Sequence, residues 1–83
     1  MPKDIIMYPL LRRYLQNIKK ERKIKYKTIA ESLDLHVNVI QSWFWGTRFP
    51  RASNILPLAK AISTSKEESQ AIALQILEIA CNE

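Results

Sequence analysis

Two short helical patterns follow each other within residues 26–46, and their closeness constrains the fold more than any other feature of the chain. Apolar residues recur at helical spacing on both sides of residues 34–36, namely Ile29, Ala30 and Leu33 before them and Ile40, Trp43 and Phe44 after them. The intervening residues leave room only for a tight turn, in which Asp34 tolerates a left-handed backbone. Gly46 is placed to cap the second helix. The pattern predicts two helices joined by a tight turn, with Leu35 packed between them.

The second helix, predicted over residues 37–45, has a buried side and an opposite side that carries Val37, Asn38, Gln41 and Ser42. An α-helix fits the major groove of B-DNA, where each base pair presents its own donors and acceptors. Asn and Gln side chains can bond adenine through two hydrogen bonds at once, and Val can contact a thymine methyl. These four residues are therefore the candidates for reading bases.

Residues 10–68 resemble the lambda-repressor/Cro-like helix-turn-helix family, the XRE-type regulators of bacteria and phages. The matching motifs occur in the family's order: Leu11 and Leu15, residues 28–33 (TIAESL) in place of E-x-L-A-x-x-L, Ile40, then Gly46, Arg48 and Pro50 of a G-x-R-x-P turn, and residues 58–62 (LAKAI). The resemblance implies an all-α fold, a compact five-helix lambda-repressor-like DNA-binding domain. It also implies a phage or plasmid repressor, a restriction-modification controller or an antitoxin, without choosing among them.

Residues around the helix-turn-helix are candidates for contacts with the DNA backbone, namely Lys25, Tyr26, Lys27, His36, Trp45, Thr47, Arg48 and Arg51. Arginines in a turn beside the groove are natural phosphate clamps, although they can also serve only the solubility of the loop. Tyr26 stands where the family has a phosphate-binding Gln, and it can either reach a phosphate or pack on the first helix. Trp45 can lie on the sugar-phosphate or only cover the loop, and both alternatives stay open.

The net charge of +5 is distributed unevenly along the chain. Residues 1–51 contain 11 Lys and Arg against 4 Asp and Glu, a net charge of +7, whereas residues 52–83 contain 2 Lys against 4 Glu, a net charge of −2. The positive part contains the helix-turn-helix, which is the asymmetry expected of a nucleic-acid-binding face. A basic cluster on its own would be interpreted as a solvated surface.

Three further helices are predicted outside residues 26–46. The first begins near Pro9, and its buried stripe is expected to consist of Leu10, Leu11, Tyr14, Leu15 and Ile18. Residues 1–7 are a lead-in, expected to pack onto the body through Ile5, Ile6 and Met7. The fourth helix, at about residues 53–63, is expected to start late with Asn54 as its cap, so that Pro57 falls in its first turn.

The fifth helix, predicted over residues 65–81, begins with a Ser65-x-x-Glu68 capping box. Its apolar set is too wide for one amphipathic stripe, so we expect two buried faces. One face would pack on the domain, and the other is a candidate dimer interface formed by Leu74, Leu77, Ile76 and Cys81. The alternative is a C-terminal helix sunk into its own core.

Composition argues against several other classes of protein. The 83 residues, 47% of them apolar, predict a single domain over residues 1–83. One His and one Cys give no metal-site spacing, and one Gly gives no phosphate-binding loop, so we expect no metal, no cofactor, no small-molecule ligand and no enzymatic activity. No apolar run approaches the ~20 residues of a membrane span, and no signal peptide is visible, so we expect a cytoplasmic protein.

Together these features predict a sequence-specific regulator of transcription that binds double-stranded DNA. We expect a repressor that binds a palindromic operator as a homodimer, through the helix 37–45 in the major groove. The main alternative is a protein-interaction module, antitoxin-like or partner-binding, without a direct sequence-specific role on DNA. A homeodomain-like reader is disfavoured because Gly46 ends the helix early.

Overall fold

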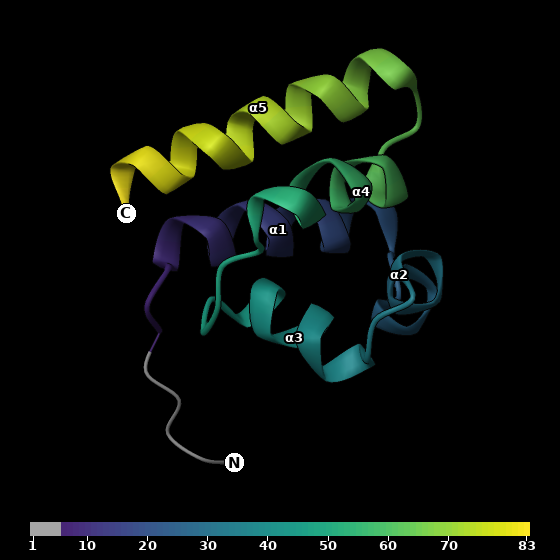
Figure 1. The fold of residues 1–83 in the computed structure, drawn as a ribbon, viewed down its shortest axis with the longest axis horizontal. Coiled ribbons are helices and arrows are strands. Elements are labelled where there is room, and N and C mark those ends of the chain that lie inside the picture. The colour runs from purple at the N-terminus through teal and green to yellow at the C-terminus, as the bar shows by residue number, and fades with distance from the viewer. Residues whose placement is uncertain (1–5) are drawn as a thin grey trace.

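The computed structural model describes residues 6–83, and this part of the chain folds into five α-helices without strands (Figure 1). The helices are α1 (Pro9–Arg22), α2 (Tyr26–Leu33), α3 (Val37–Trp45), α4 (Ala52–Ile62) and α5 (Lys66–Asn82). Helix α3 packs against α1 and α2, while α5 lies across α4 and α1 on the opposite side of the molecule. The predicted all-α class is confirmed.

Local signals end the helices where the sequence indicates. Asp34 has a left-handed backbone at φ 56° after α2, and Gly46 has φ 78° after α3, as predicted. Lys23 adopts the same conformation after α1, at φ 54°. Pro9 occupies the first turn of α1, where its missing N–H has no helical partner to lose. These caps make the connections between α1, α2 and α3 short.

A single apolar core holds the five helices together. Its buried residues are Leu11, Leu15, Ile29, Ala30, Ile40, Trp43, Phe44, Ile55, Leu58, Ala59, Ile62, Ile72, Ile76 and Ile79. The expectation for Leu10 was wrong, because its side chain is 43% exposed at the start of α1. Met7 and Ile6 are exposed as well, at 59% and 42%, although Ile6 lies beside Gly46. Ile5 lies outside the described residues.

Helix α4 differs from the expected late start. It begins at Ala52 with Arg51 as its N-cap, so Pro57 lies inside the helix. Proline removes one helical hydrogen bond, the one that would reach the carbonyl of Ser53. Ser53 and Pro57 are both exposed, so water can satisfy that carbonyl. The buried side of α4, with Ile55 and Leu58, therefore continues through the proline.

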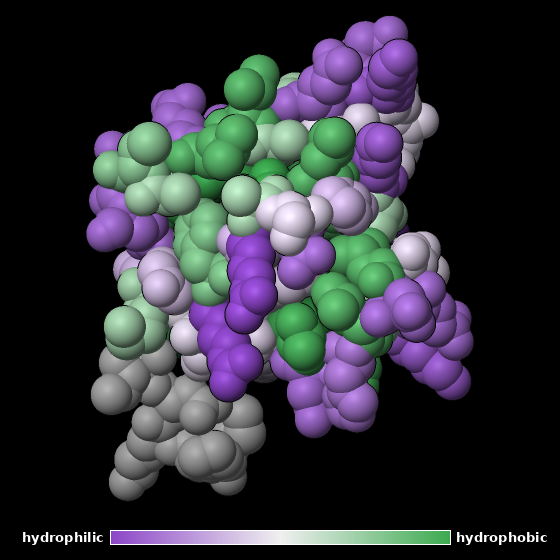
Figure 2. Space-filling view, in the orientation of Figure 1, coloured by the Kyte–Doolittle hydropathy of each residue, from purple (hydrophilic) through white to green (hydrophobic). Residues whose placement is uncertain are grey.

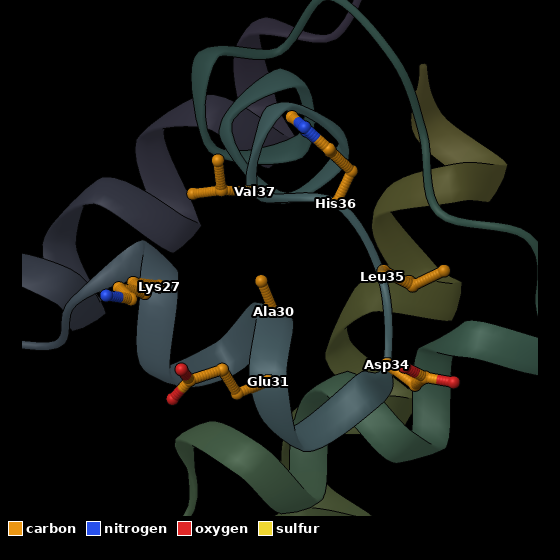
Figure 3. A pocket seen from close by; sticks show the side chains of 7 residues that line it. All are labelled: Lys27, Ala30, Glu31, Asp34, Leu35, His36 and Val37. Atoms are coloured by element: carbon orange, nitrogen blue, oxygen red, sulfur yellow. The ribbon is translucent and has the colours of Figure 1, made fainter.

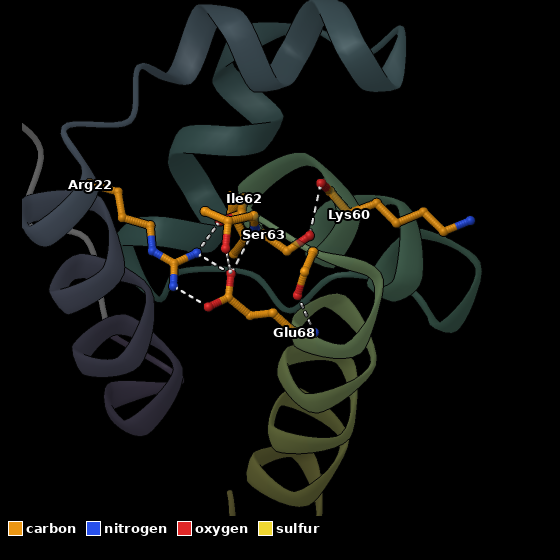
Figure 4. A network of polar contacts seen from close by, with 7 residues as sticks. Arg22, Lys60, Ile62, Ser63 and Glu68 are labelled. Carbon is orange, nitrogen blue, oxygen red and sulfur yellow. Dashed lines mark hydrogen bonds and ion pairs between the residues drawn. The ribbon is translucent and has the colours of Figure 1, made fainter.

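Helix α5 is tied to α1 at both of its ends. At its start, the Ser65 hydroxyl accepts from the Glu68 N–H at 3.1 Å, and Glu68 receives a bidentate contact from Arg22 of α1 (Figure 4). Arg22 also donates to the carbonyl of Ile62 at 2.7 Å, which brings in the end of α4. At the other end, the Glu83 carboxylate accepts from the backbone N–H of Leu10 at 3.0 Å, where it faces the positive end of the α1 dipole.

The Arg22–Glu68 contact is the ion pair found within residues 6–83. Hydrogen bonds from the Arg22 guanidinium, and then from the Thr64 N–H, lower the pKa of Glu68 to about 2. The capping box is only half formed, because the Glu68 carboxylate bonds the N–H of Thr64 at 2.7 Å rather than that of Ser65. Glu68, which the sequence predicts as a cap of α5, thus also links α5 to α1 and to the end of α4 through Arg22.

The burial of α5 corrects one expectation, the assignment of Ile76 to the candidate dimer interface. Only one face is buried in the monomer, formed by Ile72, Ile76 and Ile79. Ile76 is fully buried in the core, so it cannot belong to a surface interface. Leu74 and Leu77 are 66% and 46% exposed, and Cys81 is exposed as well. Apolar surface accordingly gathers along α5 in the upper part of the space-filling view (Figure 2).

Candidate nucleic-acid interface

Helix α3 is held in place by its apolar stripe and by one side chain from α1. Ile40, Trp43 and Phe44 are buried against the core. The Gln16 amide donates to the carbonyl of Phe44 at 2.9 Å, which satisfies one of the unpaired carbonyls at the helix end. The orientation of α3 is therefore fixed, and its other face is turned outward.

Asn38 and Trp45 mark the outward line of α3. Seven residues separate them, so they lie on nearly the same side of the helix, about 10 Å apart along its axis. Asn38 is exposed, Gln41 is half-buried, and neither side-chain amide has a hydrogen bond within residues 6–83. These two amides are therefore free to bind an external partner.

Val37 and Ser42 are less available than Asn38. Val37 is half-buried and packs against the core. The Ser42 hydroxyl donates to the carbonyl of Val39 at 2.6 Å, so it can offer a partner only its acceptor lone pairs. Both residues lie on α3, as predicted. Each has less side-chain surface or fewer free hydrogen-bonding groups for an external partner than Asn38 has.

The start of α3 borders a hollow of about 590 Å³ beside the tight turn (Figure 3). Its lining side chains come from α2, the turn and the first residue of α3, namely Lys27, Ala30, Glu31, Asp34, Leu35, His36 and Val37. His36 caps α3, with its Nδ1 accepting from the Asn38 N–H at 3.1 Å, which places the ring proton on Nε2. Glu31 and Asp34 make this hollow a mixed-charge environment.

Tyr26 is a packing residue in the structure. Its ring makes an edge contact with Phe44 at 5.2 Å between centroids, and its hydroxyl lies 3.5 Å from the Gln16 amide nitrogen. The Lys19 ammonium lies 4.9 Å from the centre of the same ring. Of the two interpretations of Tyr26, packing beside α1 is the one observed. Lys25 and Lys27 are exposed, and Lys25 makes no side-chain cap for α2.

One residue of the loop after α3, Thr47, caps the C-terminal end of the helix. The Thr47 hydroxyl and N–H both donate to the carbonyl of Ser42, at 3.2 and 3.0 Å. Thr47 is thus a capping residue whose hydroxyl proton is already engaged. Arg48 and Arg51 are exposed, and neither has an ion-pair partner within the described residues.

Trp45 is 42% exposed and stacks with a residue that the sequence did not connect to it. The Arg12 guanidinium of α1 lies 5.0 Å from the centre of the indole ring. Arg12, Arg13 and Asn17 line a second hollow of about 400 Å³ with Trp45. No sequence signal joins them, because 33 residues separate Arg12 from Trp45 and only the packing of α1 on α3 brings them together.

A comparison with known protein families, curated proteins and solved structures finds no match for this chain. Within the described residues, no helix is long and apolar enough to cross a membrane. The same part of the chain contains no group of three or more His, Cys, Asp or Glu side chains able to hold a metal ion.

Proposed function

We propose that this protein is a sequence-specific regulator of transcription, a repressor that inserts α3 into the major groove of double-stranded DNA. The proposal is carried by the outward face of α3, where the free amides of Asn38 and Gln41 follow each other beside exposed cations. Such amides match the donor and acceptor pairs of adenine. The proposed function requires no cofactor and no catalytic group. We propose a cytoplasmic location for the protein.

Exposed cations on both sides of α3 support the proposal. Lys25 and Lys27 lie before the turn, and Arg48 and Arg51 lie after the helix. Phosphate contacts of this kind fix the register of a protein on DNA without reading sequence. Base discrimination would then come from α3, and most of the affinity from the cations.

The operator is proposed to be palindromic and bound by a homodimer. Leu74 and Leu77 of α5 are exposed and lie three residues apart, just under one helical turn. Burying them between two copies would remove apolar surface from water. In the proposed complex, the two-fold arrangement keeps both copies of α3 on one side of the dimer, where they match half-sites about one helical turn of DNA (~34 Å) apart.

Selection of bound duplexes from a random library tests the proposal. We expect enrichment of a two-fold-symmetric site, with affinity that falls steeply as salt rises. Asn38→Ala should weaken binding to that site by about 1–3 kcal/mol and relax one base position. Gln70→Ala, an exposed amide on α5, is the matched control and should change nothing. Absence of any enriched sequence would contradict the proposal.

The exposed leucines of α5 also favour one alternative, a protein-interaction module that binds a partner without reading DNA. In that case Asn38→Ala and Gln41→Ala would leave function intact, while substitution of Leu74 or Leu77 would abolish it. The selection experiment separates the two, because a partner-binding module would enrich no DNA sequence.

A further inference from the structure

We propose that α1 carries a second DNA-binding element, in which Arg12 and Arg13 bind backbone phosphates beside Trp45 of α3. This inference rests on the proposed function and extends it, since neither arginine belongs to the helix-turn-helix. The contacted strand would border the groove that α3 enters. Four observations support it: the stacking of Arg12 on Trp45, the charge of the hollow, its continuity with α3, and the close packing at Gly46.

Stacking on Trp45 orders the Arg12 guanidinium before any ligand arrives. The 5.0 Å separation from the ring centre lies within the range of a cation–π contact. A guanidinium held in this way keeps N–H groups free at its edges, and these match the oxygens of a phosphate. Because the side chain is already restrained, binding loses less conformational freedom than it would with a mobile arginine.

Within residues 6–83, the charged side chains that line the hollow beside Trp45 are all positive. Arg12 and Arg13 are its charged lining residues, and Asn17 adds an amide. The hollow at the start of α3 differs, because Glu31 and Asp34 there oppose Lys27. A phosphate is therefore attracted more strongly to the hollow beside Trp45 than to the hollow at the start of α3.

The hollow continues the outward line of α3. Trp45 belongs both to that line and to the lining of the hollow. A helix in the major groove, which is about 12 Å wide, has a phosphate backbone along each border. If Asn38 contacts the base edges, then Trp45, Arg12 and Arg13 lie toward one of the two phosphate backbones that border the groove. This continuity favours a DNA strand over an acidic protein as the ligand.

Close packing at Gly46 fixes the distance between α1 and the end of α3. The Gly46 carbonyl accepts from the N–H groups of Met7 and Tyr8, both at 2.9 Å. A Cβ at Gly46 would lie 2.8 Å from the Tyr8 carbonyl oxygen and 3.0 Å from the Arg12 Cβ. The two arginines are thus carried at a set position relative to α3, as a phosphate site requires.

The test compares the double variant Arg12→Ala/Arg13→Ala with the control Lys60→Ala/Lys66→Ala. Both remove two positive charges, but Lys60 and Lys66 lie on α4 and at the start of α5. Binding to the selected operator is measured over a series of salt concentrations, after circular dichroism shows that both variants are folded. We expect the salt slope of the arginine variant to fall by about 1–2, since each phosphate contact contributes about 0.9. The control should keep the wild-type slope, and neither variant should change the preference for the operator over random DNA.

Tryptophan fluorescence gives an independent measurement on the same complex. Trp43 is 3% exposed and Trp45 is 42% exposed, so acrylamide quenches mainly Trp45 in the free protein. We expect operator DNA to protect the wild-type fluorescence from acrylamide. In Trp45→Phe only the buried Trp43 reports, and DNA should produce no such protection.

The outcomes separate this inference from the proposed function. If the wild type binds a selected operator while the arginine variant keeps the wild-type slope, the α1 site is overturned and the function stands. If DNA does not protect Trp45, the α1 site is likewise overturned. If the wild type enriches no sequence, both are overturned. Loss of binding to a poly-glutamate peptide in the arginine variant, with operator binding unchanged, would assign the hollow to an acidic protein instead.

Discussion

Helices α3 and α5 bury similar apolar stripes but present different faces to solvent. Ile40 and Phe44 of α3 are fully buried, as is Ile76 of α5. The outward side of α3 carries amides, one exposed indole and neighbouring cations, whereas that of α5 carries Leu74 and Leu77. The inward face of each helix therefore contributes to stability, and the two helices differ in their outward faces: that of α3 is polar with cations nearby, and that of α5 exposes two leucines.

The two helices also differ in how their ends are held. Helix α3 is capped by His36 at its start and by Gly46 at its end, where the side-chain amide of Gln16 also donates to the Phe44 carbonyl. Helix α5 is fastened by charged side chains from distant parts of the chain, through Arg22 at its start and through Glu83 to α1 at its end. This difference predicts a pH response at the start of α5, where the contact with Arg22 lowers the pKa of Glu68.

The largest expected loss of stability comes from substitutions in the buried apolar stripes of α3 and α5. Ile40→Ala and Ile76→Ala should each lower the free energy of unfolding by about 2–5 kcal/mol, because each removes a fully buried side chain and leaves a cavity. Urea denaturation measures both. Leu77→Ala, on the exposed side of α5, is the control and should cost less than about 1 kcal/mol in the monomer. A small effect at Ile76 would show that α5 is only loosely attached.

A smaller effect is expected where α3 ends. Gly46→Ala places a Cβ 2.8 Å from the Tyr8 carbonyl oxygen, on a backbone with φ 78°. We expect a loss of about 1–3 kcal/mol in the free energy of unfolding, from strain in the left-handed region. Asp34→Gly is the matched control at φ 56°, where glycine fits without strain, and should change stability by less than about 1 kcal/mol. Equal effects at both positions would contradict the role given to Gly46.

The outward face of α5 gives a prediction about self-association. Leu74→Glu should raise the dissociation constant of the proposed dimer at least about tenfold, because burying one leucine contributes about 1.5–3 kcal/mol. Sedimentation equilibrium over a concentration series measures the change. Gln75→Glu adds the same charge at an exposed neighbouring position and should leave the dissociation constant nearly unchanged. A wild-type protein that stays monomeric at all concentrations would refute the dimer.

The smallest expected effect is the pH dependence at the start of α5. The pKa of Glu68 is lowered from 4.5 to about 2, so its contribution to stability is present above pH 4.5. It is lost as the pH falls from about 4.5 toward 2, since the carboxylate protonates in the unfolded state first. Glu68→Gln should therefore lose less stability than the wild type over that interval. Glu67→Gln, one residue away, should follow the wild type in acid denaturation.

Features set by neighbouring residues could be predicted from the sequence. The turn at Asp34, the cap at Gly46 and the start of α5 at Ser65 all follow from the conformational preferences of single residues. The expectation failed for Pro57, because a proline on the exposed side of a helix costs less than its position in the chain suggests. It failed for Leu10 too, since periodicity does not fix the edge of a buried stripe.

Periodicity, caps and charge are local properties, so the five helices, the turn between α2 and α3, and the basic half of the chain can all be predicted from the residues alone. Three other features become visible only once the helices are packed together: Ile76 is core while Leu74 is surface, Tyr26 packs on Phe44, and Arg12 stacks on Trp45. Those outcomes depend on how α1 and α5 lie against the other helices. Packing of distant segments is set by the whole core at once, and no short stretch of sequence encodes it.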